Sequence, residues 1–137
     1  MTKKTCLITG VGPGTGSALA RRFAAGGYQI AMIARNQDRL SALEQELPDS
    51  RGYICEMSDE QAVNETVAKI SKDMGAPQIV FHNAVRGTFG NFLEMDPKDL
   101  NTNFQINTMG LLYLARAVAP PMIDRCEGVI LDRKSFV

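Results

Sequence analysis

The sequence predicts an α/β domain with a doubly wound parallel sheet. Short apolar runs recur along the chain and end at glycine or polar residues, which is typical of strands buried on both faces. Segments with apolar residues three or four positions apart separate these runs and indicate helices. No repeat, low-complexity tract or linker interrupts the alternation. The 137 residues therefore predict a single domain, 1–137, with helices on both faces of its sheet.

The first two strands and helices are predicted from their boundaries as well as their interiors. Residues 5–9 form an apolar run that stops at a glycine, and residues 28–34 form a second run. The helix between them is expected to end at Gly26-Gly27, because glycine commonly follows the last helical residue. Asn36 is a favourable N-cap for a second helix, which Pro48 terminates.

A third helix is expected to begin at Ser58, because Gln61 follows three residues later in the spacing of a capping box. Gly75 is expected to end this helix. The apolar runs at residues 53–55 and 79–81, on either side of it, predict the third and fourth strands.

The last part of the chain predicts a loop, a long helix and a strand. Residues 83–95 read as the loop, and Asp96 followed by Pro97 is a favourable helix start. The helix is expected to run to about Pro120, and residues 128–131 to begin the fifth strand. In such a sheet the ligand binds at the carboxyl ends of the strands.

Composition and charge exclude several classes of function. Fifteen basic and fifteen acidic side chains cancel, so no overall field recruits nucleic acid or an anionic membrane. Residues 1–9 lack the apolar segment of a secretory signal, and the apolar stretch 110–123 is too short to span a bilayer. The three cysteines lack zinc-ligand spacing and predict reduced core thiols. We therefore predict a cytoplasmic protein with no metal site, no nucleic-acid partner and no membrane partner.

A glycine-rich stretch, Gly10 to Gly16, lies between the first predicted strand and the first helix. Backbone amides and the positive end of the helix face a common point there, which suits a phosphate group. Glycines permit the turn and let a pyrophosphate approach the backbone, and Gly10, Gly14 and Gly16 fit that spacing. A tight turn without a ligand is the alternative. The strand before it and the helix and strand after it favour a Rossmann-type dinucleotide site.

The end of the second predicted strand bears on the choice of cofactor. An NAD-binding fold places an acidic residue there for the ribose hydroxyls, whereas this chain has Arg35-Asn36. An arginine bonded to a 2′-phosphate is worth roughly 1.5–3 kcal/mol, or about a tenfold to hundredfold preference. We therefore predict NADP(H) rather than NAD(H), with Arg35 and Asn36 at the cofactor. The alternative is that Arg35 is a solvated residue at a helix start.

Three motifs of this chain resemble the short-chain dehydrogenase/reductase family. The Thr-Gly-x-x-x-Gly-x-Gly turn of that family is matched from Thr9 to Gly16, and its Asn-Ala pair after the fourth strand by Asn83-Ala84. Its Asn-x-x-Gly on the long helix is matched from Asn107 to Gly110. The resemblance implies an NAD(P)-dependent oxidoreductase acting on a small alcohol or carbonyl substrate.

The resemblance also implies roles for single residues. Asn107 would be the active-site asparagine that holds a water in the proton relay. The Thr15 amide would contact the pyrophosphate of the cofactor. Glu56, with the adjoining Met57, would contact the adenine. Asn83 and Ala84 would lie beside the adenosine ribose.

The chain departs from the family pattern in the cofactor-binding motifs. Pro13 stands where NADP-preferring members often carry a basic residue, which leaves Arg35 as the basic determinant. His82 and Val85 replace the first Asn and the Gly of the strand-four motif, which we interpret as a strand end packed differently. His82 as a catalytic base would need a partner that the sequence does not identify.

The family's Tyr-x-x-x-Lys cannot be placed, because lysine does not follow Tyr28, Tyr53 or Tyr113 at the fourth position. Ser135 stands where the family serine is expected and is a candidate catalytic residue, although the charges at 132–134 are costly in a buried strand. The last residues resemble an unrelated tail, so we expect a member truncated after its fifth strand.

Such an ending leaves the fifth strand with an unpaired edge, which favours a homo-oligomer. Four apolar residues of the long helix are expected either in a dimer contact or against the sheet: Leu111, Leu112, Leu114 and Val118. The leading hypothesis is the cofactor-binding half of an NADP(H)-dependent short-chain reductase. The alternatives are a catalytically silent nucleotide-binding module and a fragment that acts by pairing with another subunit.

Overall fold

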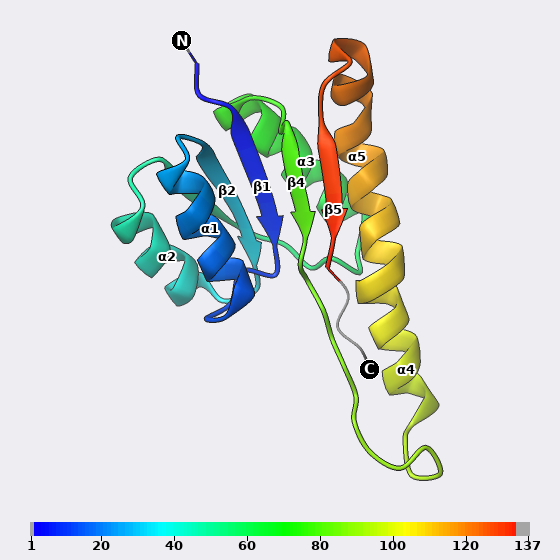
Figure 1. Cartoon of the computed structure of the whole chain (residues 1–137). Coiled ribbons are helices and arrows are strands. Elements are labelled where there is room, and N and C mark those ends of the chain that lie inside the picture. The colour runs from blue at the N-terminus through cyan, green and yellow to red at the C-terminus, as the bar shows by residue number, and fades with distance from the viewer. Residues whose placement is uncertain (1, 134–137) are drawn as a thin grey trace.

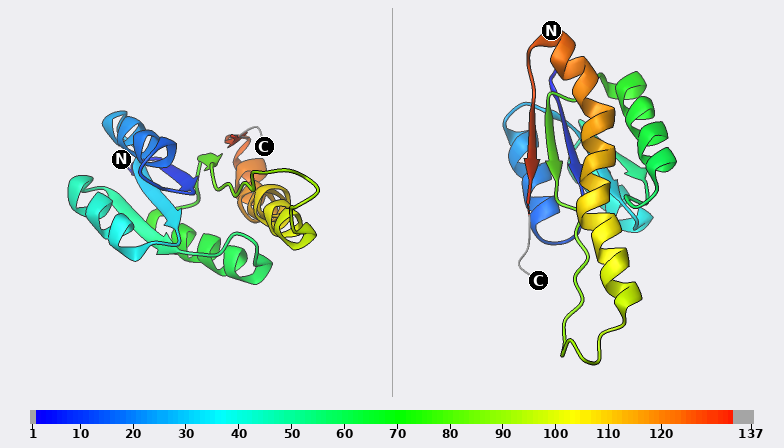
Figure 2. Two further views of the ribbon diagram at one scale, coloured as in Figure 1. Left: turned by 90° about the horizontal axis from the view of Figure 1, so that it is seen from below. Right: turned by 90° about the vertical axis from the view of Figure 1, so that its right-hand side faces the viewer.

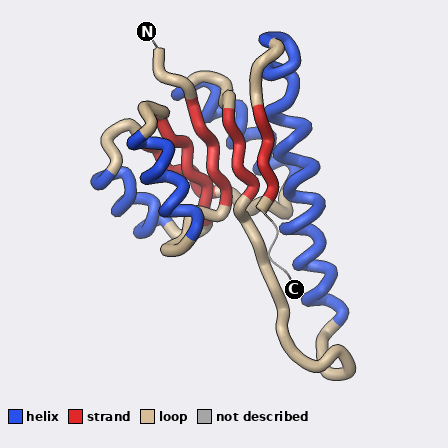
Figure 3. Tube along the Cα trace, in the orientation of Figure 1, coloured by secondary structure: helices blue, strands red, loops and turns tan. Residues whose placement is uncertain are grey.

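The computed structural model describes residues 2–133. Strands and helices alternate along most of this range (Figures 1 and 3). The strands are β1 (Thr5–Thr9), β2 (Gln29–Ala34), β3 (Ser50–Ile54), β4 (Ile79–His82) and β5 (Val129–Asp132). The helices are α1 (Thr15–Ala25), α2 (Gln37–Glu46), α3 (Glu60–Met74), α4 (Pro97–Phe104) and α5 (Gly110–Arg125), with a π-helix, Gln105–Met109, joining the last two.

The five strands form one parallel sheet in the order β3-β2-β1-β4-β5. Leu7 at the centre of β1 is in register with Ala31 on one side and Val80 on the other. The chain winds outward from β1 to β3 and then crosses to β4, so the order reverses between β1 and β4. This is the predicted doubly wound, Rossmann-type sheet, and a ligand binds where such an order reverses.

Helices cover both faces of the sheet (Figure 2), and an apolar core lies between the helices and the sheet on each face. On one face Ile8 and Met32 pack with Leu40 and other residues of α1 and α2. On the other face Leu114 and Val118 of α5 pack with residues of α3 and the sheet. The latter two residues therefore pack against the sheet, whereas Leu112 of the same helix is exposed and Leu111 is half-buried.

The start of α3 corrects the prediction for Ser58. The helix begins at Glu60, and its N-cap is Asp59, whose side chain accepts a hydrogen bond from Ala62 N at 3.1 Å. Ser58 Oγ instead donates to Glu56 Oε1 at 3.3 Å. A carboxylate at the cap also interacts favourably with the positive end of the helix, which a hydroxyl does not do.

The long helix corrects the prediction that it ends near Pro120. It runs on to Arg125 with Pro120 and Pro121 inside it. Each proline removes one backbone hydrogen bond of the helix. Val118 and Met122, on either side of the pair, are buried in the core, so tertiary packing holds the segment helical.

Smaller differences concern one strand and one cysteine. β3 begins at Ser50, earlier than the apolar run at residues 53–55, because its first residues pair with β2 but face solvent in part. Cys6 and Cys55 are buried free thiols as predicted, and burial raises the pKa of Cys6 to about 12. Cys126 is exposed, which corrects the expectation of a core thiol. No helix within residues 2–133 is long and apolar enough to cross a membrane.

Candidate dinucleotide-binding site

The glycine turn joins the end of β1 to the start of α1. Gly10 has φ of +66°, and a Cβ there would lie 2.5 Å from the Ala84 Cα. A Cβ on Gly16 would lie 2.6 Å from the carbonyl oxygen of Gly10. These two glycines are therefore required by packing, as well as by any ligand that approaches the turn.

Gly14 is different, because no described atom lies within 4 Å of the position that its Cβ would take. It is the N-cap of α1, and among the described residues no side chain caps that helix and no acidic residue lies in its first turn. The Ser17 amide of the first turn donates to the Gly12 carbonyl oxygen at 3.2 Å, which leaves the Thr15 and Gly16 amides for another partner. This arrangement fits a phosphate group of a dinucleotide.

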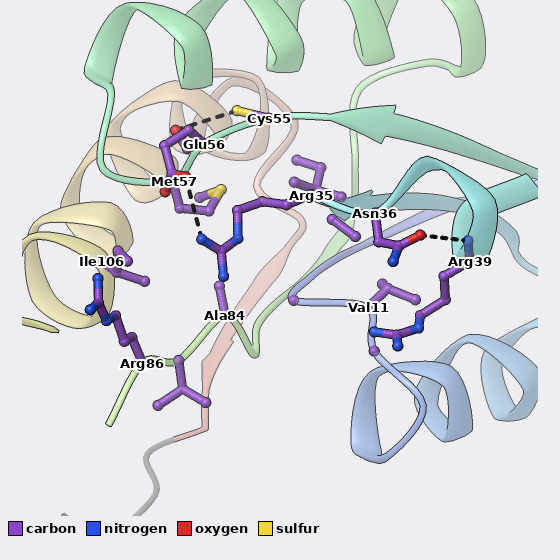
Figure 4. A pocket seen from close by; sticks show the side chains of 15 residues that line it. Val11, Arg35, Asn36, Arg39, Cys55, Glu56, Met57, Ala84, Arg86 and Ile106 are labelled. Atoms are coloured by element: carbon purple, nitrogen blue, oxygen red, sulfur yellow. Dashed lines mark hydrogen bonds and ion pairs between the residues drawn. The ribbon is translucent and has the colours of Figure 1, made fainter. Parts of the chain in front are cut away.

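A cavity of about 300 Å³ opens beside the turn, at the carboxyl ends of β1, β2 and β4 (Figure 4). It is lined by residues of the glycine turn, the end of β2, the segment after β3, the segment after β4 and the π-helix. Six residues predicted to bind the cofactor are among them: Gly10, Arg35, Asn36, Glu56, Met57 and Ala84.

Two arginines enter this cavity from the β2 end. The guanidinium of Arg35 lies 3.8 Å from the Glu56 carboxylate, so the residues predicted at the 2′-phosphate and at the adenine face each other. The Asn36 side chain accepts from Arg39 N at 3.1 Å and caps α2, as predicted. Arg39 also lines the cavity and reaches the glycine turn, where its Nη1 lies 3.5 Å from the position of a Cβ on Gly12. The two arginine side chains thus extend to different sides of the cavity (Figure 4).

Arg39 is a cavity residue that the sequence analysis did not single out. Helical spacing does not relate it to Arg35, because Arg35 precedes Asn36, the N-cap of α2. Which part of the cavity it reaches depends on the path of the glycine turn.

Asn83 and Ala84 follow β4 and close the floor of the site. The backbone amides of both residues donate to Thr9 Oγ1, each at 3.1 Å. The Asn83 side chain donates to the carbonyl oxygen of Gly10 at 3.0 Å. Asn83 is buried and holds the glycine turn in place, whereas Ala84 faces the cavity.

Asn107 lies in the π-helix and holds the loop after β4. Its Oδ1 accepts from Arg86 N at 2.9 Å, and its Nδ2 donates to the Arg86 carbonyl oxygen at 2.8 Å. The neighbouring Ile106 and Arg86 itself line the cavity. Both ends of the Asn107 side-chain amide thus contact the Arg86 backbone, and the predicted water contact of Asn107 stays a prediction.

Two further predictions concern the candidate serine and the expected absence of a metal site. Ser135 lies outside the described residues. Within residues 2–133, no group of three or more His, Cys, Asp or Glu side chains is arranged to hold a metal ion.

The order of strands, the open glycine turn and the cavity beside it define a dinucleotide-binding α/β fold. A family model described as short chain dehydrogenase matches residues 4–136. The chain belongs to the short-chain dehydrogenase family.

Several curated proteins are similar to the chain. Oxidoreductase UcpA of Salmonella typhimurium is 34% identical, over 98% of this chain and 52% of the relative. An NADPH-dependent pterin aldehyde reductase of Arabidopsis thaliana is 31% identical, over 96% and 56%. The NADP-dependent 3-hydroxy acid dehydrogenase YdfG of Escherichia coli is 32% identical, over 92% and 52%. The chain spans about half the length of these relatives.

Solved structures agree with the fold. A metagenomic short-chain oxidoreductase in complex with NADP superimposes with a TM-score of 0.92 at 25% identity, covering all of this chain and 64% of the other. A short-chain dehydrogenase from Streptomyces avermitilis has a TM-score of 0.90 at 26% identity, covering 96% and 49%.

Proposed function

We propose that the chain is the NADP(H)-binding half of a short-chain oxidoreductase that acts on a small carbonyl or alcohol. The observation that carries this proposal is the uncapped start of α1 behind Gly14, in the same turn whose residues Gly10 to Gly12 line the cavity together with Arg35 and Arg39. Two of the relatives named above are described as NADPH- or NADP-dependent, and one similar structure holds NADP. When bound, the nicotinamide donates or accepts a hydride.

Each part of the cavity has a distinct task in this proposal. The amides at the start of α1 bind the pyrophosphate. Arg35 and Arg39 provide positive charge for a 2′-phosphate, and Arg39 supplies from α2 a charge that Pro13 does not supply from the glycine turn. Glu56 and Met57 bind the adenine side. Asn107 holds the Arg86 backbone and, in this proposal, a water of the proton relay.

Titration of the chain with NADPH and NADH, followed by the fluorescence of the reduced nicotinamide, tests the proposal. We expect saturable binding of both, with NADPH at least tenfold tighter. Equal affinities for NADPH and NADH would contradict the predicted cofactor preference. Failure to bind either nucleotide would reject a dinucleotide site in this chain.

A catalytically silent nucleotide-binding module is the alternative that shares this site. Turnover of a panel of small aldehydes and ketones by a chain shown to bind NADPH separates the two. A measurable rate supports the oxidoreductase, and binding without turnover supports the silent module. The cytoplasmic location stays a prediction.

A pairing role is the second candidate, and exposed apolar residues favour it. Val129 and Leu131 of the edge strand β5 are exposed, as are Phe89 and Phe92 in the loop before α4. That loop and α4 project beyond the end of the sheet (Figure 1). We therefore propose that the chain forms a homo-oligomer, which sedimentation velocity measures directly. A monomer at all concentrations would reject it.

A further inference from the structure

His82, the single histidine of the chain, is buried at the end of β4. Only 1% of it is exposed, and its ring lies between β1, β5 and the π-helix. Its Nε2 is the only buried side-chain nitrogen or oxygen atom within residues 2–133 that lacks a hydrogen-bond partner. A buried polar atom without a partner is costly, so it calls for an explanation.

The contacts of Thr9 determine which ring nitrogen carries the proton. Thr9 Oγ1 accepts from the backbone amides of Asn83 and Ala84, and it lies 3.1 Å from His82 Nδ1. A hydroxyl oxygen has two acceptor sites and one hydrogen. Because both acceptor sites are filled, the hydroxyl must donate to Nδ1. The proton of the neutral ring is therefore on Nε2.

The backbone of the π-helix offers the candidate acceptors for this Nε2–H. Burial lowers the pKa of His82, and this effect is opposed by the charge of Asp132 and then by the backbones of Ile106 and Asn107. In the π-helix the Gly110 amide bonds to the carbonyl of Gln105, five residues earlier. One inserted residue shifts the hydrogen-bond pattern and leaves a carbonyl without its usual donor.

We propose that His82 is a positioning residue, whose Nε2–H donates to the carbonyl groups at Ile106 and Asn107 and so holds the π-helix in place. A connected path then runs from the glycine turn to the opposite wall of the cavity. Thr9 donates to His82, His82 donates to the π-helix, and Asn107 holds the Arg86 backbone. The relevance of this path to catalysis rests on the proposed function, whereas the contact between His82 and the π-helix does not.

The assignment also explains why His82 is not a catalytic base. A general base needs a free lone pair that faces the substrate. Here Nδ1 accepts from Thr9 and Nε2 carries the proton, so neither nitrogen has one. Unlike a catalytic residue, His82 acts through the backbone that carries Asn107.

NMR of the 15N-labelled chain tests the tautomer directly, because one histidine gives one pair of imidazole nitrogen signals. We expect the Nε2–H tautomer at neutral pH, with a ring proton that exchanges slowly. The Nδ1–H tautomer, or a rapid mixture of both, would overturn the proposal. This measurement needs no substitution and so does not depend on whether a variant folds.

Two variants separate the two nitrogens. His82→Asn retains an acceptor at the place of Nδ1 but has no donor at the place of Nε2, whereas His82→Gln can place a donor near Nε2. We expect amide exchange of the π-helix and of Arg86 to be roughly fivefold faster in His82→Asn, and closer to the native rate in His82→Gln. Exchange at Asn83 and Ala84 should stay unchanged in His82→Asn. Native exchange rates at the π-helix in His82→Asn would contradict the assignment.

Titration with NADPH distinguishes failure of this inference from failure of the proposed function. The predicted tautomer in a chain that binds no dinucleotide would reject the function and leave the role of His82 standing. Binding of NADPH by a chain with the Nδ1–H tautomer would reject the role of His82 and leave the proposed function standing.

Discussion

The side-chain amide of Asn107 holds both backbone groups of Arg86, its Oδ1 accepting at 2.9 Å and its Nδ2 donating at 2.8 Å. This pair connects the π-helix to the loop after β4, at the wall of the cavity. A residue predicted for catalysis thus also has a structural task. Substitution of Asn107 should therefore loosen the loop after β4, whether or not the chain catalyses a reaction.

Replacement of Asn107 by alanine removes both hydrogen bonds. We expect a loss of about 1 kcal/mol in the free energy of unfolding, because the pair is partly exposed to water. Hydrogen exchange of the Arg86 amide should accelerate strongly. Asn101→Ala, on exposed α4, is the matched control and should leave that amide unchanged. Native protection of Arg86 in Asn107→Ala would show that the pair does not hold the loop.

Alanine at Gly14 separates cofactor binding from folding. No described atom lies near the added Cβ, so the chain should fold with a loss of about 1 kcal/mol, caused by a ψ of −121° that alanine disfavours. NADPH affinity should fall at least tenfold, because the methyl group enters the space before the α1 amides.

Gly10→Ala is the contrasting variant for that experiment. Its Cβ would meet the Ala84 backbone at 2.5 Å with φ of +66°, so we expect a loss of about 3 kcal/mol or more in denaturant unfolding. Unchanged NADPH affinity in a folded Gly14→Ala chain would place the dinucleotide elsewhere.

Removal of Arg35 or Arg39 tests the preference for the 2′-phosphate. Arg35→Ala and Arg39→Ala should each weaken NADPH binding by about tenfold and leave NADH binding within about twofold. Arg22→Ala, an exposed arginine of α1 that does not line the cavity, is the control. An unchanged ratio of NADPH to NADH affinity in both variants would contradict the assignment.

Stability should decrease on mild acidification because of His82. Burial lowers its pKa from 6.5, although Asp132 on β5 and the backbones of Ile106 and Asn107 act in the opposite direction. Below pH 6.5 the unfolded chain therefore binds a proton that the folded chain resists. The free energy of unfolding then falls by up to about 1.4 kcal/mol for each pH unit, until the folded pKa is reached.

Urea unfolding between pH 8 and pH 5 measures this effect, with His82→Asn as the reference. The two chains share all carboxylates, so the difference in slope isolates the histidine. A native slope no steeper than that of His82→Asn would show that the buried ring does not resist protonation.

Much of the fold follows from local patterns. The run at residues 5–9 becomes β1, Asn36 caps α2, and the positive φ of Gly10 matches its place in the turn. Local patterns also place six of the predicted cofactor residues at one cavity, because the carboxyl ends of parallel strands meet there.

Other features depend on a choice between two local structures that the sequence pattern allows equally. Ser58 and Asp59 can both cap a helix, and the structure uses the carboxylate. A pair of prolines predicts a helix end, yet α5 continues past both prolines because Val118 and Met122 are buried in the core. In both cases the energy that decides comes from charge or core packing.

By itself the sequence determined the alternation of strands and helices, the glycine turn and the family, because these depend on residue types at short spacings. Only the tertiary structure decided that Arg35 faces Glu56, that Arg39 reaches the glycine turn, and that His82 lies against the π-helix. These contacts join segments far apart in the chain. Their geometry depends on how the sheet brings strand ends together, which no local spacing encodes.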